Sequence, residues 1–184
     1  MMRYLNILLL AAALVTVQGC AGSRLGSYSS VDRRSAGTQL EDDQIENKSI
    51  TRIQEKYKDA SQVTVTSFNR FVLITGSALS EDMKNDVERI VRAVPNVKNT
   101  ANEIVVGALA TSGARRTDSG ITGNVKSNLN KNKTIRTGTF RVATDRGVVY
   151  LLGLVTHAEA NIASEIASTT SNVKKVVRVF EYID

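Results

Sequence analysis

One pattern of apolar residues occurs twice in the chain, about 76 residues apart, and this repeat constrains the fold more than any other feature. Each copy contains a helical stripe, two short strand patterns around a polar turn, a second helical stripe and a final strand pattern. The turns fall at residues 69–70 and 145–147. We therefore predict an α+β fold of two tandem α-β-β-α-β modules, each with two helices packed on one face of a three-stranded mixed sheet.

The boundaries of the predicted elements follow from the spacing of the apolar residues. The first module is predicted to contain helix 45–57, strands 63–66 and 71–76, helix 83–94 and strand 97–106. The second is predicted to contain helix 121–129, strands 139–142 and 148–155, helix 162–170 and strand 173–182. Gly76 and Gly153 occupy matching places inside strand patterns, where glycine weakens a strand unless backbone or a helix comes close. We expect both to serve packing, with a helix as the neighbour of Gly153.

The segments outside the modules have a different composition. Residues 7–17 form an apolar run of eleven residues after Arg3, too short for the roughly 20 residues of a membrane-spanning helix and typical of an export signal. The next residues are rich in Gly, Ser and Arg without an apolar period, as expected of a tether. The predicted organisation is a signal peptide (1–19), a flexible tether (20–41), a first module (42–106), a linker (107–117) and a second module (118–184).

The residue types exclude most kinds of catalytic site. The chain has one His and one Cys, which excludes a multi-histidine metal site and an intramolecular disulfide. It has no Gly-rich phosphate loop and no nucleophile elbow, and its adjacent acids at 41–43 and 81–82 stand at starts of helices, where capping explains them. We expect a binding protein with no catalytic residues, metal ion, cofactor or small-molecule substrate.

Positive charge gathers on the second module. Residues 42–106 contain nine Lys or Arg and ten Asp or Glu, a net charge of −1, whereas residues 118–184 contain nine and six, a net charge of +3. An anionic lipid surface attracts basic residues close to it by about 1 kcal/mol each. The same excess is compatible with an ordinary solvated surface. Nucleic acid is not an expected partner, because an exported protein does not meet the chromosome and no aromatic-plus-basic platform is present.

Several short motifs carry a resemblance to a known family. The strand motif Leu152-Gly153-Leu154-Val155, its looser counterpart Thr75-Gly76-Ser77-Ala78, and the junctions Asn96-Val97 and Asn172-Val173 resemble the BON domain. The run Val17-Gln18-Gly19-Cys20 resembles a bacterial lipobox. With residues 32–43 before the first module, the whole chain is similar to the dual BON-domain outer-membrane lipoproteins of proteobacteria, which are division- and outer-membrane-stress-associated lipid-binding proteins.

The resemblance implies an address and a function. The mature protein would begin at lipidated Cys20, and Ala21 in place of Asp would direct it to the outer membrane, facing the periplasm. Members of the family are not enzymes. The implied partner of the second module is an anionic phospholipid membrane, chiefly phosphatidylglycerol, and the implied role is outer-membrane integrity at the division site. The alternative function is that of a periplasmic adaptor or chaperone acting on the outer-membrane protein assembly machinery.

The resemblance also indicates which residues contact lipid. On this chain the family's membrane surface corresponds to Ile162, Glu165, Ile166, Thr169, Thr170 and Ser171, together with Gly120 and Ile121. The best-known members carry Trp where this chain has Gly120, which leaves Ile121 as the apolar candidate there. If small residues fill the core face of the second helix, Ile162 and Ile166 form a ridge toward lipid. The competing interpretation is that both isoleucines belong to the core.

The lipobox generates the first testable prediction. Cys20→Ala should block acylation and release the protein from the outer-membrane fraction, because no thiol remains to carry the lipid. Cell fractionation together with labelling by a radioactive fatty acid measures both effects. Unchanged fractionation of the variant, with no acyl label on the wild-type protein, would contradict the prediction.

Overall fold

The computed structural model describes residues 32–58 and 61–184 and contains the predicted unit twice. The first copy consists of α2 (Ala36–Tyr57), β1 (Ser61–Phe68), β2 (Phe71–Ala78), α3 (Glu81–Arg92) and β3 (Asn99–Val106). The second consists of α4 (Ser112–Lys131), the short 3-10 helix η2 (Thr137–Thr139), β4 (Phe140–Asp145), β5 (Val148–Val155), α5 (His157–Ser168) and β6 (Lys175–Tyr182). The signal peptide, Cys20 and the start of the tether lie outside the described residues.

Each module has the predicted mixed sheet. In the first, β2 lies in the middle, antiparallel to β1 and parallel to β3. In the second, β5 takes the same place between β4 and β6. The hairpin explains the antiparallel pair, and the helix that follows the middle strand carries the chain over to the parallel one. The α-β-β-α-β prediction is confirmed for both modules.

The two helices of each module cover one face of its sheet and bury apolar stripes there. The stripe residues of the first module are Ile45, Ile53, Val87 and Val91. Those of the second are Ile121, Val125, Leu129, Ala163 and Ala167. Each stripe repeats at helical spacing, so the sequence pattern and the packing agree.

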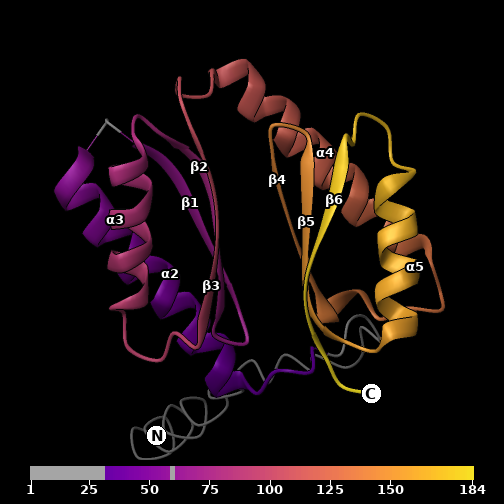
Figure 1. Ribbon diagram of the computed structural model, residues 1–184. Helices are drawn as coiled ribbons and strands as arrows, with labels where there is room; N and C mark the ends of the chain where they lie inside the picture. Colours follow the sequence, from indigo (N-terminus) through magenta and orange to yellow (C-terminus); the bar gives the residue numbers. More distant parts are fainter. Residues whose placement is uncertain (1–31, 59–60) are drawn as a thin grey trace, which may run out of the picture.

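The other faces of the two sheets pack against each other. Phe68 and Leu73 from the first module form one buried cluster with Tyr150 and Leu152 from the second. Figure 1 shows the result: the two sheets face each other in the middle, and the helices lie on the two outer sides. The molecule is therefore a four-layer structure in which the outer faces of α4 and α5 point away from the first module.

A buried aspartate in the first helix of each module holds the turn of its hairpin. Asp42 accepts hydrogen bonds from the backbone N–H of Asn69 (2.8 Å) and Arg70 (2.7 Å). Asp118 accepts the same pair from Arg146 (2.8 Å) and Gly147 (2.9 Å). The turn residues have positive φ, so their N–H groups point away from the hairpin and need this partner.

The first helix of each module begins earlier than the apolar stripe that predicted it. The helix α2 begins at Ala36, inside the predicted tether (20–41), where the hydroxyl of Ser35 accepts from the backbone N–H of Thr38. The helix α4 begins at Ser112, inside the predicted linker (107–117), with Thr111 as its cap. Hydroxyl caps rather than apolar spacing determine both starts.

Both strand glycines lie where a side chain would collide with neighbouring backbone. At Gly76, which has a φ of +120°, an added Cβ would overlap the carbonyl oxygen of Gln62 on β1. At Gly153 it would lie 2.7 Å from the carbonyl oxygen of Thr139. The expectation that a helix crowds Gly153 is wrong, because the close neighbour is the end of η2 as the chain enters β4.

This contact predicts the effect of substitution. Gly153→Ala should lower the free energy of unfolding by about 1–3 kcal/mol, because Thr139 belongs to backbone that must shift. The control is Gly123→Ala on α4, where an added Cβ meets nothing within 4 Å and alanine should raise stability by about 0.5–1 kcal/mol. Urea denaturation measures both changes. Equal stability of the two variants would refute a packing role for Gly153.

Candidate functional site

The basic residues of the second module are nearly all free of acidic partners. Of its nine Lys and Arg residues, only Arg141 has a described carboxylate within 4.0 Å, that of Glu46 at 3.0 Å. In the first module four of nine have such a partner: Lys56, Arg70, Arg89 and Arg92. The eight others of the second module are Lys126, Lys131, Lys133, Arg136, Arg146, Lys174, Lys175 and Arg178. None of these eight is neutralised by a described carboxylate, although Arg146 and Arg178 donate to uncharged groups of the protein.

The acids of the second module are mostly engaged elsewhere. Asp118 is buried under the hairpin turn, and Asp184 accepts from the exposed His157 at 2.7 Å. Burial, together with the nearby carboxylate of Asp118, raises the pKa of Asp145. Glu165 remains as an exposed acid on α5. The excess of positive charge inferred from the sequence is therefore a property of the surface.

Small residues let α5 lie close to the sheet. Thr156 and Glu159 form a capping box at its start, with the Thr156 hydroxyl accepting from the backbone N–H of Glu159 at 3.2 Å. Ala160, Ala163 and Ala167 are completely buried against the sheet. This close approach leaves the larger side chains of α5 on its flanks and outer face.

The structure distributes the predicted lipid residues of α5 and the turn after it over three environments. Glu165, Thr169 and Ser171 are exposed. Thr170 is buried, and its hydroxyl accepts from the Asn128 amide of α4 at 3.0 Å. Ile162 and Ile166 are half-buried and pack against the core of the second module. The two isoleucines therefore form neither a fully exposed ridge nor a fully buried core pair.

The two predicted residues of α4 also differ in environment. Gly120 is exposed, and nothing lies within 4 Å of where its Cβ would be. Ile121 is only 3% exposed and belongs to the core, because it follows the buried stripe of α4. The expectation that Ile121 replaces the missing aromatic as a surface anchor is wrong. The Ile121 side chain is accessible only where it lines a pocket.

This pocket, which we call the turn pocket, lies beside the hairpin turn of the second module. It is formed by α4, the β4–β5 turn and the loop between α5 and β6, and its volume is about 460 Å³. Its lining comprises Ala114, Thr117, Asp118, Ile121, Arg146, Gly147, Asn172, Val173 and Lys174. Apolar side chains and a free lysine thus meet next to the predicted positions Gly120 and Ser171.

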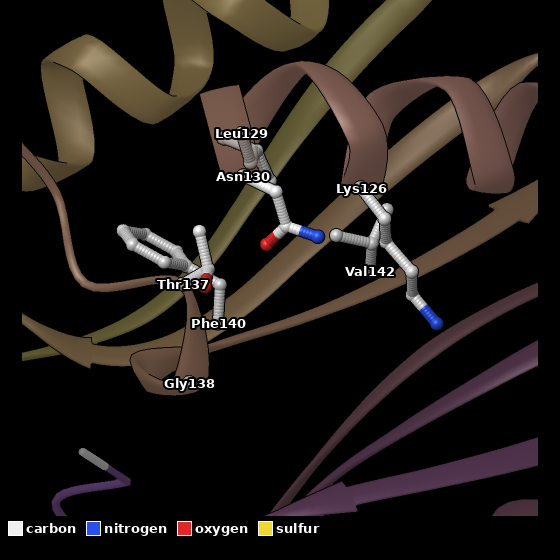
Figure 2. Close-up of a pocket in the computed structure, with 7 residues that line it drawn as sticks. All are labelled: Lys126, Leu129, Asn130, Thr137, Gly138, Phe140 and Val142. Atoms are coloured by element: carbon white, nitrogen blue, oxygen red, sulfur yellow. The ribbon is translucent and has the colours of Figure 1, made fainter. Parts of the chain in front are cut away.

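A second pocket lies at the other end of α4, where that helix passes over η2 and the start of β4. It has a volume of about 290 Å³ and a mixed lining, in which Leu129, Phe140 and Val142 are the apolar residues. In Figure 2 the Asn130 side chain lies between α4 and the turn that carries Thr137, while the amine of Lys126 points away from Thr137 and Phe140. The smaller pocket therefore has an apolar floor without a cation directed into it.

A segment before α2 ties the start of the first module to the second. The guanidinium of Arg33 donates to both carboxylate oxygens of Glu159, at 2.7 and 2.8 Å, and to the carbonyl oxygen of Leu154 at 2.7 Å. Arg34 donates to Asp42 at 2.7 Å and lies 3.9 Å over the ring of Phe68. We call this segment, residues 32–34, the strap. It holds the first turn of α5 against the first module.

Comparisons with known proteins agree with this architecture. A sequence profile described as "BON domain" matches residues 41–108 and 117–184. The chain belongs to the BON-domain family. Both modules are BON domains, and the repeat found in the sequence is a duplication of that domain. The two matched ranges place the strap just before the first BON domain.

Two curated relatives carry the same family relationship over most of their length. The chain is 31% identical to "Outer membrane lipoprotein DolP" of Haemophilus influenzae, over 97% of this chain and 96% of the relative. It is 30% identical to the "21 kDa hemolysin" of Actinobacillus pleuropneumoniae, over 83% and 80%. Among solved structures, CdsD of the Chlamydia trachomatis type III secretion system aligns with 73% of this chain and 90% of its own at 10% identity, with a TM-score of 0.32, too low to establish a shared fold.

The described residues contain neither a membrane-spanning helix nor a cluster of metal-binding side chains. None of the helices in residues 32–58 and 61–184 has the length and apolar character needed to cross a bilayer. Those residues contain no group of three or more His, Cys, Asp and Glu side chains that could hold a metal ion. Within the second BON domain of the described chain, the features that suit a binding role include the free cations and the two pockets.

The strap generates a prediction about pH. The hydrogen bonds from Arg33, the largest effect, lower the pKa of Glu159 below its usual range. The stabilisation is therefore present above the ordinary glutamate pKa and is lost as the pH falls through the lower pKa of the folded state. Glu159→Gln, which keeps a capping-box residue type, should cost about 1 kcal/mol at pH 7. At a pH below the lowered pKa of the folded state, the variant and the wild type should be equally stable.

Urea denaturation at several pH values measures this difference. Arg136→Ala serves as the control, since Arg136 is exposed and has no described carboxylate within 4.0 Å. A stability difference for Glu159→Gln that does not change with pH would show that the strap does not act through the carboxylate charge.

Proposed function

We propose that this protein is an outer-membrane lipoprotein, anchored at Cys20 and facing the periplasm, whose second BON domain binds anionic phospholipid. The observation that carries the proposal is that eight of the nine basic residues of this domain lack an acidic partner among the described residues. Each basic residue held near an anionic bilayer gains about 1 kcal/mol. A few of them in contact would give measurable binding that weakens with salt.

The relatives support the address and the class of protein. One relative is named as an outer-membrane lipoprotein, and it is similar over nearly the whole chain. The lipobox at residues 17–20 supplies the means of anchoring. The resemblance to division- and stress-associated members of the family adds phosphatidylglycerol as the preferred lipid, and outer-membrane integrity at the division site as the role.

The outer face of α4 and α5 is the proposed contact surface. Ile162 and Ile166 lie on the flank of α5 near α4, since Thr170, one turn after Ile166, bonds to Asn128 of α4. Half-buried isoleucines in such a position present apolar surface to the lipid without leaving the core. Glu165 is exposed on the same helix, and its charge opposes binding to an anionic surface.

Vesicle binding with charge reversal tests the proposal. Protein from residue 20 onward, carrying Cys20→Ala, should sediment with vesicles containing phosphatidylglycerol but not with phosphatidylcholine vesicles. Lys174→Glu changes the charge by two units and should weaken binding roughly thirtyfold, at about 1 kcal/mol per unit. Lys98→Glu is the matched control, because Lys98 occupies the same place in the first BON domain and should have little effect. Lys174→Glu should also reduce enrichment at the division site.

Equal weakening by both variants would show that the second domain is not the binding surface.

A second candidate function, that of a periplasmic adaptor or chaperone for the outer-membrane protein assembly machinery, is favoured by a different observation. Leu79 and Val105 of the first BON domain are 57% and 39% exposed. Failure of the wild-type protein to bind any anionic vesicle would favour this candidate over lipid binding.

A further inference from the structure

We propose that the turn pocket of the second BON domain holds the glycerophosphate headgroup of one anionic phospholipid molecule, with the Lys174 ammonium beside the phosphate. This inference rests on the proposed function and deepens it, from a charged face to a defined site. The pocket volume of about 460 Å³ lies within the range of about 300–1,000 Å³ typical of small-molecule sites.

The first BON domain has an ion pair at the corresponding place. Arg70 and Gly147 are counterparts, because each donates its backbone N–H to the buried aspartate of its own domain. The carbonyl oxygen of each also accepts a 2.9 Å hydrogen bond from the backbone N–H of the lysine that follows the second helix, Lys98 or Lys174.

The side chains at these places differ between the two domains. In the first domain the guanidinium of Arg70 lies 3.6 Å from the carboxylate of Glu41. In the second domain the corresponding residues are Gly147 and Thr117, neither of which can make that ion pair. Both line the turn pocket. The duplication thus provides an internal comparison in which an ion pair occupies the place that is open in the second domain.

The missing side chain at Gly147 also determines where the cation lies. The stem of Lys174 passes over Gly147, and an added Cβ there would lie 3.0 to 3.1 Å from three of its carbons. No described carboxylate lies within 4.0 Å of the Lys174 ammonium. Lysine is a common ligand of phosphate as a point charge. The glycine therefore brings a free ammonium group to the edge of the pocket.

The other charged groups of the pocket are held by the protein. The Arg146 guanidinium donates to the Ser77 hydroxyl at 2.7 Å and to the Ala108 carbonyl oxygen at 2.9 Å, both outside the second domain. Asp118 is 7% exposed, and both of its oxygens accept backbone N–H groups of the turn. Lys174 is consequently the cation that can respond to a ligand.

The rest of the lining suits the glycerol and upper acyl region of a lipid. Ile121, Val173 and Ala114 supply apolar surface, and Thr117 and Asn172 supply a hydroxyl and an amide. Asn172 brings the turn after α5 to the same opening. A headgroup held here would direct its acyl chains along the outer face of α4 and α5, which is the proposed membrane surface.

The test transfers the closing ion pair of the first domain into the second. Thr117→Glu with Gly147→Arg leaves the net charge unchanged, so general attraction to an anionic bilayer is preserved. Position 147 has a φ of +79°, and Arg70 already adopts a φ of 67° at the counterpart position, so the backbone of this turn accepts an arginine. Its Cβ would lie 3.0 to 3.1 Å from the Lys174 stem, so the double variant displaces this flexible side chain as well as filling the pocket. Dihexanoyl phosphatidylglycerol, below its micelle concentration, is the probe. The lipid affinity of the double variant should fall at least tenfold, with its melting temperature close to that of the wild type.

Wild-type amide NMR shifts provide a measurement that does not depend on the variant. The probe should shift the amides of Gly147, Asn172 and Lys174, and no corresponding shifts should occur at Arg70, Asn96 and Lys98. Free glycerol 3-phosphate should bind at least tenfold more weakly than the short-chain lipid. Equal affinity for glycerol 3-phosphate would overturn the lipid assignment in favour of a simple anion site.

The outcomes separate this inference from the proposed function. If the wild-type protein binds phosphatidylglycerol vesicles but its turn-pocket amides do not respond to the short-chain lipid, the pocket assignment is overturned and the lipid-binding function stands. The same conclusion follows if the folded double variant binds the probe as tightly as the wild type. If the wild-type protein binds neither vesicles nor probe, the proposed function itself fails.

Discussion

The packing of the two sheets against each other is the contact on which the rest of the structure depends. The middle strands β2 and β5 carry apolar residues on both faces, so a layer of helices on one side leaves Leu73, Tyr150 and Leu152 in need of cover. Each sheet supplies that cover for the other. Polar contacts surround the apolar seam, including the ion pair between Arg141 and Glu46. Burial, with the nearby Glu103 carboxylate, raises the pKa of Tyr150 to about 12, so its phenol stays neutral at the seam.

The sequence predicted the local structure well because each element has its own signal. The repeat, the turns with positive φ and the Thr156 capping box follow from short patterns that tertiary contacts did not override. The contact between the sheets was missed, although the unbroken apolar run at 148–155 is the pattern expected of a strand buried on both faces. The starts of α2 and α4 were missed because single hydroxyl caps determine them.

The candidate site was harder to predict because it depends on exposure, which spacing alone does not determine. Ile121 has the same helical period as Val125 and Leu129, and that period already pointed to the core. Ile162 and Ile166 fall at the edge of the buried face, where a helical wheel cannot decide between core and surface. The turn pocket has no motif of its own. In the sequence, only the difference between Arg70 and Gly147 at matching positions of the repeat could have pointed to this pocket. That difference matters because Arg70 forms an ion pair with Glu41, which only the structure shows.

The strap, residues 32–34, determines where the N-terminal segment that would carry the lipid anchor leaves the folded part of the protein. Arg33 is held at the first turn of α5, whereas the turn pocket lies beyond the other end of that helix. The twelve residues of α5 span about 18 Å. The chain from Cys20 to Asp32 can extend over about 40 Å at most. This maximum length is roughly twice that of the helix, so under the proposed anchoring at Cys20 the pocket end could reach the leaflet that holds the anchor. If the segment between Cys20 and Asp32 were much shorter than α5, the end of the molecule that carries the turn pocket could not reach the membrane that holds the anchor.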